Sequence, residues 1–313
     1  MSTLAAGASI QVDPIFNTKP RGLWSNAMRR LFHRRSAIVG MVILGSLMFI
    51  AIFAPLLATH DPIQSLIGVE EVKKREGPCI HVLGCAIEKP QHLFGIDGNV
   101  RDLYSRVIYG SRLSLFVGFA AVGFAIVIGT LIGAFSGYMG GYWDNFFMGL
   151  MDILLAFPSL ILAIAIVTVL GPGLINTMFA IGIVNIPIYA RITRASVLSI
   201  KQQDYVLAGR SIGSTGNRIL FQNILPNALT PLVVQGTLGI GTAIIEAAAL
   251  SFLGLGAQPP TPEWGSMIGQ ERNQVFTAPQ LILFPGIALV LTVVGFNLLG
   301  DGLRDALDPR QRS

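Results

Sequence analysis

Few side chains in this sequence are placed where they could do chemistry, and three of them fall inside long apolar runs. Asp152 lies in the run 144–169, whereas Gln235 and Glu246 lie in the run 228–250. An ionisable group inside an apolar span usually faces the interior of a helix bundle or a polar path. Asp152 could therefore line a path or contact a neighbouring helix. Glu246 could bind a solute or tether the loop that follows it.

The two cysteines are the next candidates. Cys79 and Cys85 are six residues apart, with Gly84 between them. In an oxidising compartment such a pair can close a small loop, whereas in the cytosol it stays reduced. Two thiols could also bind a metal, but with only His81 nearby the ligand count falls short of a structural zinc site. The sequence therefore favours a disulfide and predicts no metal site.

Several kinds of chemistry have no support in the sequence. There is no phosphate-binding GxxxxGK[ST] motif, so we expect no catalytic site for ATP hydrolysis and no cofactor in this chain. The four histidines all fall outside the apolar runs, which excludes haem ligation at membrane depth. Asp152 and Glu246 are too few, and too near opposite edges, to form the proton relay of an ion-coupled carrier.

The composition places these residues in a membrane protein. Of 313 residues, 52% are hydrophobic and 12% are charged, and the mean hydropathy is +0.63, whereas soluble domains average about 25% charged residues. The formal net charge of +5 could indicate nucleic-acid binding. The basic residues cluster at the ends of apolar runs, however, as membrane topology requires. We therefore expect an all-α polytopic membrane protein and no nucleic-acid partner.

Six apolar runs are long enough to cross a hydrocarbon core of about 30 Å. A basic tail, 1–36, precedes the first span, 37–58, and a polar loop, 59–110, follows it. The region 111–300 holds spans two to six, which begin near residues 113, 144, 174, 228 and 281, and 301–313 is a polar tail. Because most Lys and Arg residues fall in the tails and in one later loop, we expect both termini in the cytosol and 59–110 outside.

That later loop, 197–226, is the longest polar interruption among the last five spans. Asp204 is its one acid, and the basic residues in and beside it are Arg191, Arg194, Lys201, Arg210 and Arg218. The apolar spacing predicts a helix, a tight turn at Gly213 and a second helix running into Pro226. The loop either presents its backbone to a cytosolic partner or lies as an amphipathic segment on the bilayer surface.

Several stretches resemble one family. Residues 207–209, Gly213 and 223–226 are similar to the EAA loop of ABC importer permeases, although Leu207 stands where the family has Glu and Asn223 where it has Ile. The stretches 94–115, 251–265 and 296–309 resemble the C-type permease subunit of dipeptide and oligopeptide importers, with Val100 in place of a usual Gly. The resemblance runs from about residue 29 to residue 309.

This resemblance implies the ABC type I importer permease fold in a bacterial or archaeal cytoplasmic (inner) membrane. Besides the lipid bilayer, the implied partners are a second, B-type permease subunit, two cytosolic ABC ATPases that bind ATP and Mg²⁺, and an extracytoplasmic peptide-binding protein. The implied ATPase-coupling residues are Asp204, Leu207, Ala208, Gly209, Arg210, Gly213, Leu225 and Pro226.

The implied cargo is a dipeptide or an oligopeptide, with glutathione or a nickel chelate as the alternatives. Glu246 would then be placed to meet a peptide's amino group, with Gln235 and Asp152 as further candidates for the path. The family has Arg where this chain has Gly149, which leaves the ion partner of Asp152 open. We expect Arg191 and Arg194 to be snorkelling anchors and Trp264 to be an anchor at the membrane interface.

Overall fold

The computed structural model describes residues 28–307, and in that range the chain forms helices and two isolated β-bridges but no β-strand. Five of its helices are long and apolar enough to cross a membrane. They are α2 (Arg35–Ile52), α4 (Leu103–Met139), α7 (Leu174–Ile200), the continuous helical segment Gly216–Phe252 that contains α10 (Leu225–Phe252), and α12 (Gln280–Leu307). The prediction of an all-α polytopic membrane protein is therefore confirmed.

The third span predicted over 144–169 is not one continuous helix. This stretch belongs to two helices, α5 (Gly141–Leu155) and α6 (Ser159–Leu170), which are bent by 92° at the break between them. Pro158 sits at that break, where its ring excludes a helical hydrogen bond and disfavours helical geometry at Phe157. Alone, α6 would rise about 18 Å, which is too short to cross the membrane. The sixth span exists only if the bent pair is counted as one.

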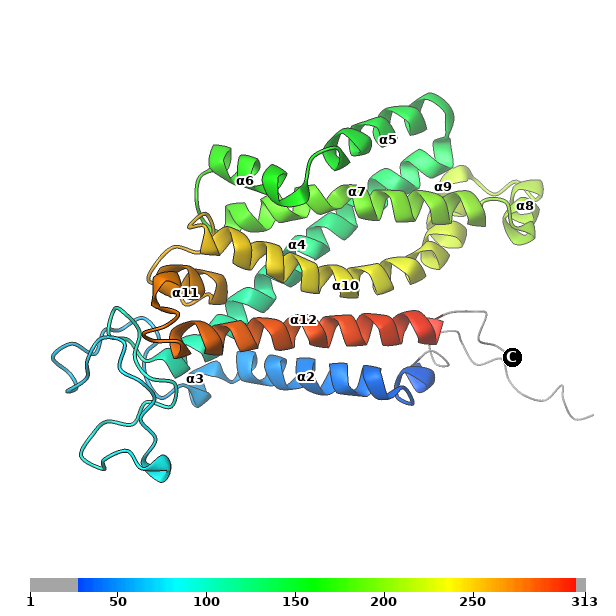
Figure 1. The fold of residues 1–313 in the computed structure, drawn as a ribbon. Coiled ribbons are helices and arrows are strands. Elements are labelled where there is room, and N and C mark those ends of the chain that lie inside the picture. Colours follow the sequence, from blue (N-terminus) through cyan, green and yellow to red (C-terminus); the bar gives the residue numbers. More distant parts are fainter. Residues whose placement is uncertain (1–27, 308–313) are drawn as a thin grey trace, which may run out of the picture.

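The long helices pack side by side in a bundle (Figure 1). α2 lies along α12, α10 follows next, and α4 crosses to lie along α7. Glycines allow the close approach of α4 and α7, because a Cβ at Gly129 would lie 2.8 Å from the Ile186 carbonyl oxygen and one at Gly133 would lie 2.2 Å from that of Ala190. Such small residues let helix backbones approach where lipid supplies no hydrophobic drive for association.

Several helices begin or end at other residues than predicted. α4 starts at Leu103 because the Asp102 carboxylate caps it, accepting a hydrogen bond from the Ser105 backbone N–H at 2.8 Å. α7 continues through Pro187 to Ile200. α2 ends at Ile52, and the short helix α3 (Ala54–Leu57) follows it. The predicted loop 59–110 thus includes the first two turns of α4.

The two ends of the bundle differ. The first turn of α2, the last turn of α12 and the short helix α8 (Asp204–Ser211) lie at one end, whereas the long loop before α4 and helix α11 (Trp264–Glu271) lie at the other (Figure 1). Trp264 is fully buried, and its indole N–H donates to the Val107 carbonyl at 2.9 Å. The expectation that Trp264 anchors the protein at the membrane interface is therefore wrong.

Candidate functional site

The segment between α7 and α10 turns sharply at Gly213, as its sequence predicts. The N–H of Gly213 donates to the Arg210 carbonyl at 3.0 Å, and the N–H of Ser214 donates to that of Gly209 at 3.1 Å. This pair of bonds is the Schellman ending of a helix, which places its C′ residue in the left-handed region. Gly213 has φ +81°. A Cβ there would have no other atom of this chain within 4 Å, so the need for glycine is conformational.

The chain after this turn is helical again and does not stop at Pro226. α9 (Gly216–Arg218) leads through a π-helical segment, Ile219–Ile224, directly into α10. Proline cannot donate a backbone hydrogen bond, and its ring collides with the carbonyl four residues earlier. The wider π-turn that precedes Pro226 accommodates both effects. The second predicted helix is thus the first part of the fifth span.

α8 is fixed against the ends of three long helices. Val206 is buried in an apolar cluster with residues of α4, α7 and α10. The Tyr205 hydroxyl donates to the Asn223 carbonyl at 3.3 Å and accepts from the Asn227 amide at 3.2 Å. At the end of α7, the Lys201 ammonium donates to the Tyr138 carbonyl at 2.6 Å. α8 is therefore packed against the ends of α4, α7 and α10.

The outer face of this segment is mixed in character. Of the predicted coupling residues, Gly209 is buried, Leu225 is half-buried, and the exposed ones are Asp204, Leu207, Ala208, Arg210, Gly213 and Pro226. The apolar side chains of Ile212 and Phe221 are also exposed, Ile212 by 83%. Exposed apolar groups rimmed by charges are typical of protein-binding surfaces. Ile212 and Phe221 were not predicted as surface residues, although both are apolar residues in a polar loop.

Two ion pairs join α5 to α7 near the same end. Asp144 accepts from Nε and from a terminal nitrogen of Arg194, both at 2.6 Å, and also from the Ser136 hydroxyl of α4. Asp152 pairs with Arg191. Both arginines that were expected to be snorkelling anchors thus also pair with acids of α5. The ion partner of Asp152 comes from α7, which makes Asp152 a contact between helices.

Glu246 faces α7 from the last two turns of α10. The Asn185 amide donates to a Glu246 carboxylate oxygen at 3.2 Å and to the Ile181 carbonyl at 2.9 Å. Glu246 therefore bonds within the bundle instead of tethering the loop after α10. Gln235 lies eleven residues before Glu246, or about three helical turns, so both side chains leave α10 on the same side. Asn185 is the member of this group that the sequence prediction did not include.

The opposite end of the molecule is built from the loop before α4. Cys79 and Cys85 are joined by a disulfide, with their Cα atoms 5.4 Å apart. The backbone N–H of Lys73 and the ammonium of Lys89 both donate to Glu76 at 2.9 Å, which holds the pKa of its carboxyl below the usual range. Arg75 donates to Glu271 of α11, also at 2.9 Å. The loop and α11 thus form one continuous surface.

Comparison with known proteins identifies the family. The family described as "binding-protein-dependent transport system inner membrane component" matches residues 129–313, and the "N-terminal TM domain of oligopeptide transport permease C" matches residues 22–70. The dipeptide transport system permease protein DppC of Alkalihalophilus pseudofirmus is 47% identical over 93% of this chain and 91% of its own length. The glutathione transport system permease protein GsiD of Escherichia coli is 44% identical over 92% and 90%.

Further comparisons agree. The di/tripeptide transport system permease protein DppC of Pseudomonas aeruginosa is 43% identical over 90% of each chain. A solved chain of the MetNI methionine ABC transporter, in an inward-facing conformation, superposes with a TM-score of 0.54 over 65% of this chain and 96% of its own, at 20% identity. The fold is thus shared with an ABC importer. By its family match and its relatives, this chain belongs to the inner-membrane permease components of binding-protein-dependent transport systems.

Proposed function

We propose that this chain is the permease subunit of an ATP-driven importer of dipeptides or oligopeptides. The observation that carries the proposal is the 47% identity with a dipeptide permease over 93% of the chain. The multi-pass helical bundle supplies the membrane-spanning part of such an importer. With a second, B-type permease it forms the path through which the peptide crosses the cytoplasmic membrane of a bacterial cell.

The coupling element in this proposal is the 197–226 segment. We place it and both termini in the cytosol, on the positive-inside bias. The exposed Leu207, Ala208 and Ile212 give α8 an apolar face that fits a groove on a cytosolic ATPase. Asp204 and Arg210 flank that face as charged contacts. Two ATPase subunits bind ATP and Mg²⁺, and this chain has no catalytic site of its own.

The contacts of α8 suggest how the ATPases act on the path. Tyr205 and the buried Val206 attach α8 to the start of α10, and α10 carries Gln235 and Glu246 farther along. The Asp144–Arg194 pair keeps the end of α7 against α5. When the ATPases close, they displace α8 and with it the ends of α7 and α10. The Asn185–Glu246 contact between these helices then opens to a passing peptide, whose amino group Glu246 attracts.

The outer end is the docking place for the partner that delivers the peptide. The loop before α4 and α11 form one surface, joined by the Arg75–Glu271 pair and stabilised by the Cys79–Cys85 disulfide. An extracytoplasmic peptide-binding protein would release its ligand here. A second candidate cargo is glutathione, because the GsiD relatives are 44% identical over 92% of the chain.

Purification tests this proposal. The tagged chain, solubilised from native membranes in mild detergent, should retain two ATPase chains and one other permease. Mass spectrometry of small molecules bound to the extracytoplasmic partner should then distinguish dipeptides and longer peptides from glutathione. Isolation of this chain alone, with transport activity that needs no nucleotide, would contradict the proposal.

A further inference from the structure

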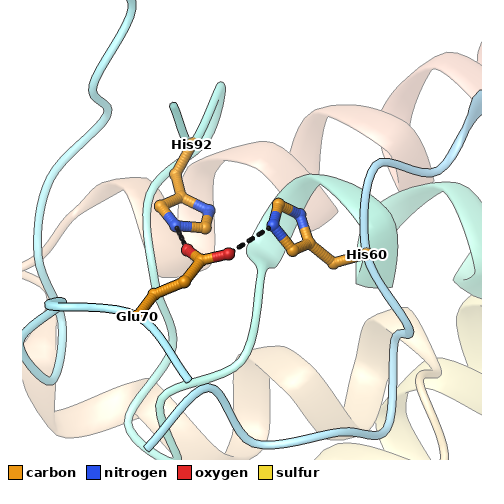
Figure 2. A group of neighbouring side chains, drawn as sticks. All are labelled: His60, Glu70 and His92. Atoms are coloured by element: carbon orange, nitrogen blue, oxygen red, sulfur yellow. Dashed lines mark hydrogen bonds and ion pairs between the residues drawn. The ribbon is translucent and has the colours of Figure 1, made fainter. Parts of the chain in front are cut away.

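Two histidines and one glutamate that are distant in sequence meet at the outer end of the molecule. His60 follows α3, whereas Glu70 and His92 lie in the long loop before α4. His60 Nε2 lies 3.2 Å from Glu70 Oε1, and His92 Nε2 lies 3.0 Å from Glu70 Oε2. Figure 2 shows both imidazole rings turned toward the two oxygens of the same carboxylate. The three ligand atoms lie within 4.8 Å of one another.

The surroundings of His92 require a positive species in this group. Its side chain is only 3% exposed, and its two nitrogens face two different carboxylates, because Nδ1 lies 2.8 Å from Asp102 Oδ1. An ionised carboxylate only accepts hydrogen bonds, and a neutral imidazole donates only one. One of the two contacts of His92 therefore needs a second proton or a metal ion to make it favourable.

A metal ion between the three side chains makes both contacts of His92 favourable. The Nδ1–H of His92 then donates to Asp102, which fixes the tautomer and directs the Nε2 lone pair toward the ion and Glu70. A carboxylate that orients a histidine in this way is a regular feature of metal sites. Asp102 is itself held rigidly, because its other oxygen accepts from the Ser105 backbone N–H at 2.8 Å as the cap of α4.

His60 is oriented by equivalent contacts. Its Nδ1 lies 2.9 Å from the Thr59 hydroxyl, and its backbone N–H donates to the Ser105 hydroxyl at 3.0 Å. In the tautomer in which Nδ1–H donates to that hydroxyl, the lone pair of Nε2 is left for a metal ion. Both histidines thus present Nε2 toward Glu70, whose side chain is partly exposed and open to the outer aqueous side.

The ligand types indicate which metal fits. Calcium and magnesium prefer oxygen ligands alone, whereas two imidazoles and one carboxylate are a known zinc set with a fourth position for water. Zinc lies about 2.0–2.1 Å from such ligands, so two of them at a tetrahedral angle are about 3.3 Å apart. Each histidine Nε2 already lies near that distance from one Glu70 oxygen, 3.2 Å from Oε1 for His60 and 3.0 Å from Oε2 for His92. All three ligand atoms lie within 4.8 Å of one another, so binding of the ion would draw them closer together.

We propose that His60, Glu70 and His92 bind one Zn²⁺ ion at the outer end of this permease. The ion joins His60, which follows α3, to Glu70 and His92 of the loop. Through Asp102 it is also connected to the start of α4. It therefore holds the outer surface in one arrangement. This site contradicts the prediction of no metal site, which missed it because its ligands are separated by 10 and 22 residues and match no local metal-binding spacing.

Metal binding by the full-length chain in its purified complex tests the proposal. After chelator treatment and removal of the chelator, titration with Zn²⁺ should saturate at about one ion per chain, measured by calorimetry and by elemental analysis. Glu70→Gln keeps the shape of the side chain but removes the anionic ligand, and His60→Gln removes one imidazole. We expect each to weaken Zn²⁺ binding at least tenfold.

His81→Gln is the matched control, because His81 belongs to the same loop and its Nε2 is hydrogen-bonded to the Lys89 carbonyl, at 2.8 Å. It should leave Zn²⁺ binding unchanged. Co²⁺ in place of Zn²⁺ should give the visible absorption of a tetrahedral site in the parent and in this control, and lose it in Glu70→Gln. If either ligand variant fails to fold, the other supplies the test. The proposal is wrong if the folded parent binds no stoichiometric Zn²⁺, or if both ligand variants bind it as the parent does.

Discussion

Replacement of Gly213 probes the turn that positions α8. At φ +81°, a residue with a Cβ is strained by about 1–2 kcal/mol, and a β-branched residue is the worst case. Nothing in this chain lies within 4 Å of the added Cβ, so a steric term is absent and the whole penalty is conformational. We therefore expect Gly213→Val to unwind the end of α8, whereas Gly213→Asn is tolerated because asparagine visits the left-handed region.

The size of the functional effect follows from this penalty. If α8 unwinds and relieves this strain when it is not bound to the ATPase, binding must restore the strained turn. A strain of about 1–2 kcal/mol then weakens ATPase binding by roughly 5- to 30-fold. In proteoliposomes that contain the complete importer, Gly213→Val should lower peptide uptake and ligand-stimulated ATP hydrolysis together. The amount of the Gly213→Val variant in the membrane should be unchanged, because the turn lies outside the apolar spans.

The pair of variants separates three explanations. Low activity in Gly213→Val with near-normal activity in Gly213→Asn supports the conformational account. Equal loss in both variants would mean that the backbone of a partner approaches Gly213 closely. Full activity in Gly213→Val would refute the coupling role and make this segment an amphipathic surface element.

Three further predictions concern the rest of the chain. In a cysteine-free background, a cysteine at Ser214 should be protected from an impermeant maleimide in intact cells and one at Gln258 should be labelled; labelling at Ser214 would overturn the proposed orientation. Asp144→Asn should lower the free energy of unfolding by about 1–3 kcal/mol, because it weakens a partly buried, bidentate pair whose carboxylate is 12% exposed. Asp152→Asn is its control and should cost below about 1 kcal/mol, since the side chains of that pair are 52% and 60% exposed; equal shifts in thermal melting would contradict the distinction. Non-reducing intact-mass analysis should find Cys79 and Cys85 two hydrogens lighter than the free thiols, and their replacement by serine should destabilise the outer loop by roughly 2 kcal/mol; free thiols in rapidly alkylated protein would exclude the disulfide.

Much of the fold follows from local patterns in the sequence. Apolar runs of about 20 residues predict the spans directly, and Gly213 predicts the turn because few other residues adopt its backbone angles. The break at Pro158 was not predicted, although proline is its cause. The run 144–169 is long enough to cross the membrane if straight, and composition alone does not reveal a 92° bend.

Contacts between distant residues account for the other features that local patterns did not predict. Arg194 lies 50 residues from Asp144, and Arg191 lies 39 from Asp152, so the pattern around each arginine indicates only a charged helix end. Trp264 is buried because helix α11 folds back against α4, which no local signal shows.

Val100 shows how packing overrides local preference. Where the resembling family has glycine, this valine adopts φ +56°. Its side chain is buried in a cluster with Leu66 and Ile96, and this burial offsets the backbone strain. A left-handed residue is therefore present at this turn without a glycine.

ATP-driven uptake of a labelled dipeptide into proteoliposomes tests the central claim most directly. The vesicles should contain this chain, its second permease and both ATPases, with ATP supplied on the side that exposes α8 and the binding protein on the other. We predict that peptide moves toward the ATP side only when ATP is hydrolysed, and that a proton gradient alone drives none. Uptake that follows the proton gradient and continues without ATP would contradict the account.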